Sequence, residues 1–320
     1  MSQKPKVIIT GGAGLLGSAV THQLVQEGKY TPIVMGRSTD PKRVLDIMDD
    51  IIYERGDVSD IEFLEHVIKT HSPEKIYHFA TVLGDACETQ VDMATQVNVD
   101  GFIKMIELVE KYEVKQLLFS SSMTTFGEGL DTKVIDDRCL QRPGSFYGVT
   151  KLFQEGAGRF FRKKHGVDFR AIRYPAIIGP GSRAGGFVSY TSDIINYALK
   201  NEPYVVKFKP DMKLPLLHTK DAARAIIDLG NAPKESIKEV CYLINGVLNP
   251  PNAGELSEMV KAKLPNANTS FKVDEEWQKV LESSAVLIDD KYAKNEWGWK
   301  PTFDTYDKII DDFIDEQGRI

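Results

Sequence analysis

The chain has 320 residues, of which 42% are hydrophobic and 27% are charged, and its formal net charge is −6. These proportions are close to the average of globular proteins, so they argue against disorder and against a coiled coil. An acidic chain offers no broad basic surface of the kind that binds nucleic acid, and we expect no nucleic-acid partner.

Two further classes of protein are also disfavoured. No apolar run approaches the roughly 18 residues that span a bilayer, and the N-terminus leads directly into a strand and a glycine loop. We therefore expect neither a membrane segment nor a signal peptide. The three cysteines, Cys87, Cys139 and Cys241, are widely spaced, and the six histidines are scattered. This spacing argues against a disulfide framework and a metal site, so the expected location is a reducing cytoplasm.

In chain order, the first half alternates between short β-branched runs and helical stretches. This pattern predicts strands at 6–10, 31–36, 51–57, 75–80, 115–122 and 168–174. It predicts helices from the glycine loop to Gly28 and at 61–71, 92–112 and 146–165. Such alternation is typical of βαβ units, which form a parallel sheet with helices on both faces.

After Pro175 the alternation stops. A Gly- and Pro-rich loop is predicted at 177–186, followed by a helix at 190–200, strands at 204–208 and 214–218, a helix at 220–229 and a strand at 240–246. The remainder, 253–320, is predicted to be mainly helical, with a short strand near 269–273.

This layout predicts an α/β fold: a Rossmann-type doubly wound parallel sheet with a smaller, mostly helical C-terminal substrate domain. The dinucleotide-binding domain is expected at 1–175, completed by about 214–246. The substrate domain is expected at 176–213 and 247–320.

The stretch TGGAGLLG at 10–17 follows the first predicted strand and opens the first helix. Gly11 permits a tight turn, Gly14 lets the backbone approach a pyrophosphate, and Gly17 lets the helix pack closely on the sheet. The helix N-terminus then offers free N–H groups and a positive dipole end to phosphates. The residues expected to bind the diphosphate are Gly11, Gly14, Leu15, Leu16 and Gly17. The alternative is a glycine-rich turn without a ligand.

The end of the second strand usually selects the cofactor. Gly36 occupies the position of the acidic residue that bonds the ribose hydroxyls of NAD, and Arg37 follows it. An arginine there favours the 2′-phosphate of NADP, so we expect NADP or NAD, with a preference for NADP. The alternative is that Arg37 is a solvated surface charge and that NAD binds without the usual carboxylate.

Three residues form a candidate catalytic set. Tyr147 and Lys151 are four residues apart near the start of a predicted helix, so they share a face. Ser122 ends the fifth predicted strand, where ligands bind in open parallel sheets. Oxidation of an alcohol needs a base for the hydroxyl proton, and a tyrosine whose pKa is lowered by a nearby ammonium can supply it. A Tyr and a Lys at this spacing also occur by chance, so the glycine loop provides the necessary context.

Together these motifs resemble those of the extended short-chain dehydrogenases/reductases, the NAD-dependent epimerase/dehydratase family. The resemblance covers nearly the full length of the chain: TGGAGLLG, GDVSD, HFAT, VNVDG, the serine strand, the Tyr–Lys pair, RYPAIIGPG and DDKYAKNEWGWKP. It implies an NAD(P)-dependent oxidoreductase that transfers a hydride to or from a small hydroxy or carbonyl substrate. It also implies that Tyr147 is the acid/base, that Lys151 tunes it and holds ribose, and that Ser122 orients the reacting oxygen.

The resemblance implies further contacts. Residues expected at the cofactor, in addition to the glycine loop and the catalytic pair, are Arg37, Asp57, Val58, Ala80, Val82 and Asn98. Residues expected at the substrate are Leu83, Ser122, Thr124 and Phe187. The helix at 146–165 often forms a dimer interface in this family, so a homodimer is expected.

Two departures bear on the substrate. Nucleotide-sugar enzymes of the family hold a diphosphate with an Asn and an Arg, whereas this chain has Ala176 and Leu214 at those positions. The C-terminal half is more similar to short-chain L-threonine 3-dehydrogenases, yet Phe187 and Val188 replace two small hydroxyl residues. A nucleotide-sugar epimerase or dehydratase with retained cofactor, and a non-catalytic NAD(P)-binding sensor, stay open as alternatives.

Overall fold

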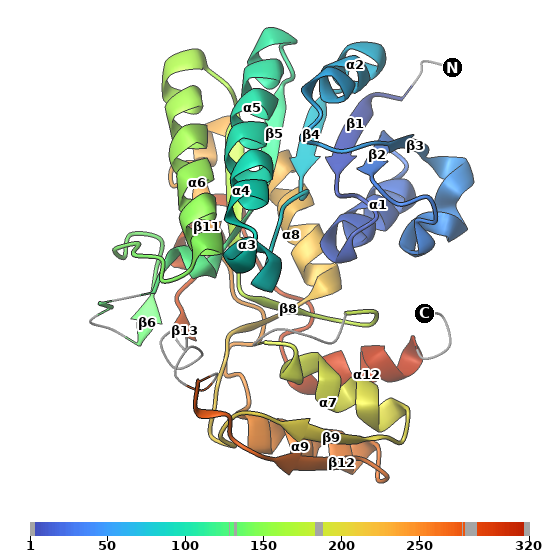
Figure 1. The fold of residues 1–320 in the computed structure, drawn as a ribbon, viewed down its shortest axis with the longest axis vertical. Helices are drawn as coiled ribbons and strands as arrows, with labels where there is room; N and C mark the ends of the chain where they lie inside the picture. Colours follow the sequence, from blue (N-terminus) through green and yellow to red (C-terminus); the bar gives the residue numbers. More distant parts are fainter. Residues whose placement is uncertain are drawn as a thin grey trace.

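The protein is described by a computed structural model that covers residues 4–127, 129–130, 133–182, 188–276, 278 and 287–316. A parallel sheet of seven strands crosses the upper part of the molecule in Figure 1, in the order β11-β7-β5-β4-β1-β2-β3. The strands are β1 (Lys6–Thr10), β2 (Thr31–Gly36), β3 (Ile52–Arg55), β4 (Lys75–His78), β5 (Gln116–Ser122), β7 (Phe169–Tyr174) and β11 (Cys241–Leu243). The predicted Rossmann-type fold is confirmed, and the strand order reverses between β1 and β4, where such sheets bind ligands.

Helices cover both faces of this sheet. Along β1, Val7 and Ile9 face one hydrophobic cluster and Ile8 faces another, as the period of two in a strand requires. The first cluster is completed by α1 (Leu15–Glu27), the 3₁₀ helix η1 (Lys42–Asp50), α8 (Thr219–Asn231) and α11 (Lys291–Trp297). The second is completed by α2 (Ile61–His71), α5 (Gly101–Lys111) and α6 (Phe146–His165).

A second group of elements lies below the sheet in Figure 1 and has its own hydrophobic cluster. Its helices are α7 (Tyr190–Leu199), α9 (Ala253–Lys263) and α12 (Tyr306–Asp315). Its paired strands are β8 (Ala176–Ile178) with β10 (Leu216–His218), and β9 (Pro203–Val206) with β12 (Asn268–Phe271). The domain boundaries given above stay predictions.

Several short elements differ from the predictions. The helix predicted at 92–112 consists of α4 (Val91–Ala94), a π-helical turn η2 (Thr95–Asp100) and α5, and α3 (Asp85–Thr89) precedes it. The strand predicted at 240–246 is limited to β11, because Val240 has a φ of 68° and cannot continue a strand. Elements that were not predicted are η1, β6 (Val134–Ile135), its partner β13 (Leu287–Ile288), and the 3₁₀ turns η3 (Met123–Thr125) and η4 (Lys234–Ser236). The loop predicted at 177–186 is wrong at its start, because Ile177 and Ile178 belong to β8 and pair with β10.

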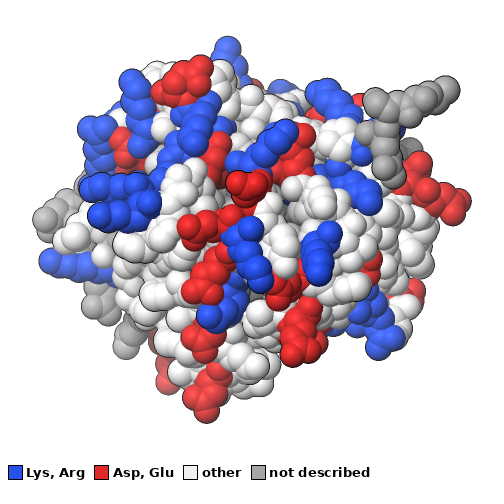
Figure 2. Space-filling model, turned by 90° about the horizontal axis from the view of Figure 1, so that it is seen from above, with Lys and Arg blue, Asp and Glu red and all other residues white. Residues whose placement is uncertain are grey.

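The surface carries charges of both signs. On the face shown in Figure 2, Lys and Arg side chains are interspersed with Asp and Glu side chains. No helix among the described residues combines the length and the apolar character that crossing a membrane would demand. All three cysteines are free thiols, and the cytoplasmic location stays a prediction.

Candidate active site

One large cavity, with a volume of about 1070 Å³, lies at the carboxyl ends of the central strands. Its wall includes most of the predicted site residues: Gly11, Gly14, Leu15, Leu16, Gly17, Arg37, Asp57, Val58, Ala80, Val82, Leu83, Ser122, Thr124 and Tyr147. Asn98 and Lys151 are buried and are not part of the described wall, and Phe187 lies outside the described residues.

The glycine loop forms a backbone cradle at one end of the cavity. A Cβ on Gly17 would lie 2.2 Å from the carbonyl oxygen of Gly11, so no other residue fits there without a backbone shift. Helix α1 begins directly after Gly14, with no side-chain cap and no acidic residue in its first turn. Its first N–H groups therefore lack a side-chain partner and face an anion-sized space, which fits a dinucleotide diphosphate.

The end of β2 carries the charged part of the wall. The Arg37 side chain is 78% exposed, and its Nη1 lies 3.5 Å from Oδ2 of Asp57. Burial alone would raise the pKa of Asp57, but hydrogen bonds from Ser59 and the charge of Arg37 outweigh it and hold that pKa below its ordinary value. Ser59 donates from its backbone N and its hydroxyl to Oδ1 of Asp57, at 2.9 and 2.8 Å. Asp57 is thus a carboxylate held by Ser59 beside an exposed guanidinium.

Asn98 supports the wall from behind. Its Oδ1 accepts a hydrogen bond from the backbone N of Val82 at 2.8 Å, and its Nδ2 donates to the Val82 carbonyl oxygen at 2.9 Å. The same Nδ2 donates to the Thr150 hydroxyl on α6 at 3.2 Å. The side chain therefore links the segment after β4 to the helix that carries Tyr147, rather than facing the cavity.

The start of α6 is fixed by two side chains. The hydroxyl of Ser145 accepts a hydrogen bond from the backbone N of Gly148 at 3.1 Å, which is an N-cap. The carboxylate of Glu88, on α3, accepts hydrogen bonds from the backbone N of Phe146 and of Tyr147, each at 3.0 Å. These contacts set the position of Tyr147 relative to the cavity.

Ser122 and Tyr147 meet in the wall. The Ser122 hydroxyl accepts hydrogen bonds from the backbone N of Thr124 at 3.2 Å and from its hydroxyl at 2.9 Å. Burial raises the pKa of Tyr147 above its ordinary value, and Cys87 adds to this, while a hydrogen bond with Ser122 acts in the opposite direction. The lowered tyrosine pKa expected from the sequence is therefore not found, because the loss of hydration outweighs the other effects.

Lys151 is buried directly behind Tyr147, with 1% of its surface exposed. Its Nζ donates to the carbonyl oxygen of Ser120 at 2.8 Å and lies 4.6 Å from the ring centroid of Phe119. Burial lowers the pKa of Lys151 to about 7, although Cys87 and Glu155 act to raise it. The ionic state of this lysine thus depends on its neighbours at neutral pH.

The other end of the cavity is apolar. Sequence reasoning did not identify most of its wall, which comes from segments far apart in the chain: Phe126, Leu130, Ala176, Ile177, Val188, Leu214 and Pro215. Single apolar residues in loops carry no local signal of a binding site. Within the described part of the wall, the only charged side chains are Arg37 and Asp57, at the end of β2 and after β3.

Comparisons with known proteins agree with this geometry. Residues 7–244 match the NAD dependent epimerase/dehydratase family. The mitochondrial L-threonine 3-dehydrogenase of Bos taurus is 29% identical over 304 residues, which are 95% of this chain and 80% of the relative. The solved structure of L-threonine dehydrogenase from Clostridium difficile has a TM-score of 0.88 and 28% identity, covering 99% of this chain and 98% of that one. A monomeric L-threonine 3-dehydrogenase from a metagenome has a TM-score of 0.87 and 25% identity, covering 98% and 99%.

Proposed function

The chain belongs to the NAD dependent epimerase/dehydratase family and is an NAD(P)-dependent oxidoreductase of the extended short-chain type, and we propose that its substrate is a small, uncharged hydroxy or carbonyl compound. The observation that carries the catalytic part is that Ser122 and Tyr147 line one cavity together with the glycine loop, while Nζ of Lys151 lies 5.5 Å from the centroid of the Tyr147 ring. A nicotinamide cofactor, when bound, accepts or supplies the hydride.

The residues of this chain then handle the proton. During oxidation Tyr147 takes the proton of the substrate hydroxyl, and during reduction it returns that proton to the carbonyl oxygen. Ser122, oriented by Thr124, holds the reacting oxygen by a hydrogen bond. The ammonium form of Lys151 stabilises the phenolate of Tyr147.

Replacement of Tyr147 by Phe tests this mechanism. The variant should lose about a hundredfold or more in kcat, because no other group takes the proton, while the Kd of the reduced cofactor stays within about twofold. Tyr112→Phe is the matched control, since the Tyr112 hydroxyl contacts Glu65 on the outer helices and lies away from the cavity. Full turnover by Tyr147→Phe would remove the mechanism.

Arg37 supports a preference for NADP. It lines the cavity beside Ser38, and no acidic residue ends β2. Arg37→Ala should raise the Kd of NADPH by about tenfold, the value of one charge-assisted contact, and leave the Kd of NADH within about twofold. Tighter binding of NADH than of NADPH by the unchanged protein would contradict the preference.

The apolar wall supports an uncharged substrate. Ala176, Leu214 and Val188 face the cavity and offer no cation for a carboxylate or a diphosphate. Turnover should be compared between L-threonine, on which the similar enzymes act by name, and neutral compounds of the same size such as 2,3-butanediol and 3-hydroxybutan-2-one. We expect a higher kcat/KM for a neutral compound, and a preference for L-threonine would contradict this.

An exposed apolar stripe on α6 supports a homodimer. Val149, Phe153 and Phe160 are 45%, 42% and 53% exposed, and they follow one another at helical spacing. A Cβ on Gly156, between them, would meet nothing within 4 Å, so a second helix can approach closely. Sedimentation should give a dimer that Phe153→Glu converts to a monomer. A monomer at all concentrations would contradict the proposal, and one similar enzyme is monomeric.

A further inference from the structure

Three residues at intervals of four on α6 share one face of the helix and contact the end of β5. They are Tyr147, Lys151 and Glu155, and the third was not predicted from the sequence. Nζ of Lys151 donates to the Ser120 carbonyl oxygen at 2.8 Å, the Glu155 carboxylate accepts from the Ser121 hydroxyl at 2.5 Å, and Tyr147 lines the cavity together with Ser122. Glu155 is 1% exposed and does not line the cavity, so any effect it has on the site is indirect.

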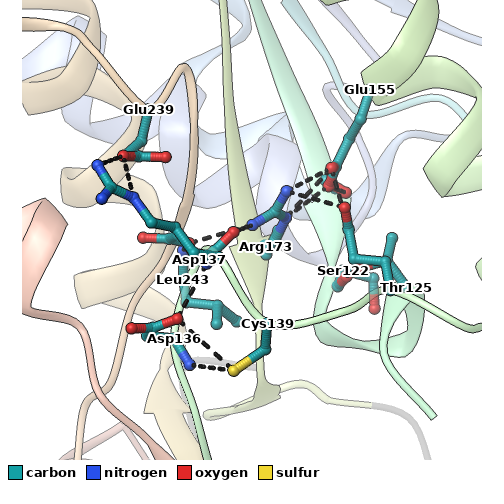
Figure 3. A network of polar contacts seen from close by, with 12 residues as sticks. Ser122, Thr125, Asp136, Asp137, Cys139, Glu155, Arg173, Glu239 and Leu243 are labelled. Carbon is teal, nitrogen blue, oxygen red and sulfur yellow. Dashed lines mark hydrogen bonds and ion pairs between the residues drawn. The ribbon is translucent and has the colours of Figure 1, made fainter. Parts of the chain in front are cut away.

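The Glu155 carboxylate is held by a buried arginine. Arg173 donates from Nε to Oε1 at 2.9 Å and from Nη2 to Oε2 at 2.7 Å, which is a bidentate ion pair. Figure 3 shows Arg173 between Glu155 on one side and Asp137 on the other. Arg173 on β7 stands opposite Ser121 on β5 in the sheet register, so the contacts cross two neighbouring strands and the helix above them.

A second carboxylate completes the cluster. Arg173 donates from Nη1 to Oδ1 of Asp137 at 3.2 Å, and the backbone N of Leu243 donates to the same oxygen at 2.5 Å. Burial raises the pKa of Asp137 to about 7 against the effects of Leu243 and Arg173, and the charges of Glu239 and Glu155 add to the rise. The Asp137 carboxyl therefore holds its proton more tightly than an ordinary carboxyl does, and Glu155 is the bidentate partner of Arg173.

We propose that Glu155 is a positioning residue of the active site: its carboxylate fixes the end of β5 against α6 and keeps a negative charge one helical turn from Lys151. The proposal rests on the roles proposed above for Tyr147 and Lys151. Arg173 and Gln141 hold the carboxylate in place, the latter through an Nε2 to Oε2 hydrogen bond of 3.2 Å.

The physical reason lies in the burial of Lys151. An ammonium without water is unfavourable, and a nearby negative charge is what retains the proton. Of the groups around Lys151, the Glu155 carboxylate and Cys87 act in that direction. His78 on β4 also faces Lys151, and burial together with the Lys151 charge lowers its pKa to about 3, so it contributes no charge at neutral pH. Cys87 is a buried thiol whose pKa is raised by burial, so it is neutral at ordinary pH and the carboxylate carries the effect.

Replacement of Glu155 by Gln keeps the shape and removes the charge. The pH dependence of kcat for substrate oxidation should then shift its ascending limb to higher pH by about one unit, because fewer Lys151 ammonium groups stabilise the Tyr147 phenolate. At neutral pH kcat should fall about tenfold. The Kd of the reduced cofactor, measured by fluorescence, should stay within about twofold, which separates this effect from a loss of binding.

Ser121→Ala is the matched control, since it removes one contact of Glu155 and leaves its charge. We expect a two- to threefold lower kcat, of the order of one lost hydrogen bond, and an unshifted limb. If the ascending limb of the pH profile is unshifted in Glu155→Gln, the proposal is overturned, even if the kcat of the variant is low. A merely structural role lowers kcat without moving the pH profile.

If Glu155→Gln fails to fold, a second variant tests the same proposal. The double change E155Q/R173M removes both charges, so no unpaired charge stays buried, and it should show a smaller shift in the same direction. An unshifted limb, or failure of both variants to fold, would assign the ion pair to folding alone and overturn the proposal. Tyr147→Phe is assayed in the same experiment. If Tyr147→Phe stays active, the proposed function is wrong. If it is inactive while the ascending limb of the pH profile is unshifted in the Glu155 variants, only the proposed role of Glu155 is wrong.

Discussion

The two ends of the cavity are built in different ways. At the cofactor end, the glycine loop is one continuous stretch from the end of β1 into α1, and its geometry follows from four glycines within seven residues. At the substrate end, the wall is assembled from η3 and the loop after it, β8, and the segments before α7 and β10. A local motif can thus specify the backbone cradle at one end of the cavity, whereas the wall at the other end depends on how distant segments pack.

The largest effect is expected from Gly17→Ala, at the cofactor end. A Cβ there would lie 2.2 Å from the Gly11 carbonyl oxygen and 2.7 Å from the Gly12 Cα, so the loop must shift. The Kd of the reduced cofactor should rise by about a hundredfold or more, since the backbone N–H groups lose their common geometry. Gly254→Ala on α9 is the control, because its Cβ would meet no atom closer than 3.3 Å. Unchanged binding by Gly17→Ala would show that the loop is only a turn.

This contrast also explains what could be predicted from the sequence. The strand alternation and the glycine loop are local patterns, so the fold and the cofactor end of the wall follow from them. The pairing of β6 with β13 joins two-residue strands from distant parts of the chain, and such strands are too short to show periodicity. The φ of 68° at Val240 could not be predicted from the sequence, because left-handed backbone conformations are expected at glycines.

The buried ion pair was missed for a related reason. Arg173 and Glu155 are 18 residues apart, on a strand and on a helix, and a charged residue in either is usually exposed. Only the register of β5 with β7 shows that Arg173 lies under the site. Ser122 and Tyr147 could be proposed from the sequence because their spacing resembles a family pattern, whereas no sequence pattern indicated Glu155 and Arg173.

The next effect concerns the cluster behind the substrate end. The pKa of Asp137 is raised from 3.8 to about 7, so the folded protein binds this proton more tightly than the unfolded chain does. The stability that the protonated carboxyl contributes is full below about pH 4 and is lost as pH rises through about 7. Between pH 5 and pH 8 the unfolding free energy of the unchanged protein should fall by about 3 kcal/mol relative to that of Asp137→Asn, measured by urea unfolding. Parallel loss of stability in both proteins would contradict the raised pKa.

A smaller effect is expected at the substrate wall. Val188 lines the cavity and is 41% exposed. Val188→Thr therefore changes the polarity of the wall, keeps the shape of the side chain and alters the stability of the protein little. The ratio of kcat/KM for L-threonine to that for a neutral alcohol should rise by about tenfold, the value of one polar contact in a pocket. The Kd of the cofactor should not move. Val205→Thr on β9 is the control, since Val205 is 48% exposed and lies outside the described wall.

The smallest effect is expected at the point where the two ends meet. Leu83 and Ala86 line the cavity, and Glu88, on the same short segment, accepts both N–H bonds from the start of α6. Because Glu88 is exposed, water can replace its carboxylate, and Glu88→Ala should cost only about 0.5–1 kcal/mol of stability as an N-terminal helix contact.

The effect of Glu88→Ala on turnover should be correspondingly small, a two- to threefold decrease in kcat, because Tyr147 is still held by α6 and its Ser145 cap. Asp85→Ala on the same helix is the control. If Glu88→Ala weakens cofactor binding as much as turnover, the glycine loop and the substrate wall respond together, and the two ends of the cavity are not independent. If it alters turnover alone, α6 can be displaced slightly without disturbing the diphosphate cradle, as expected for two regions specified by separate contacts.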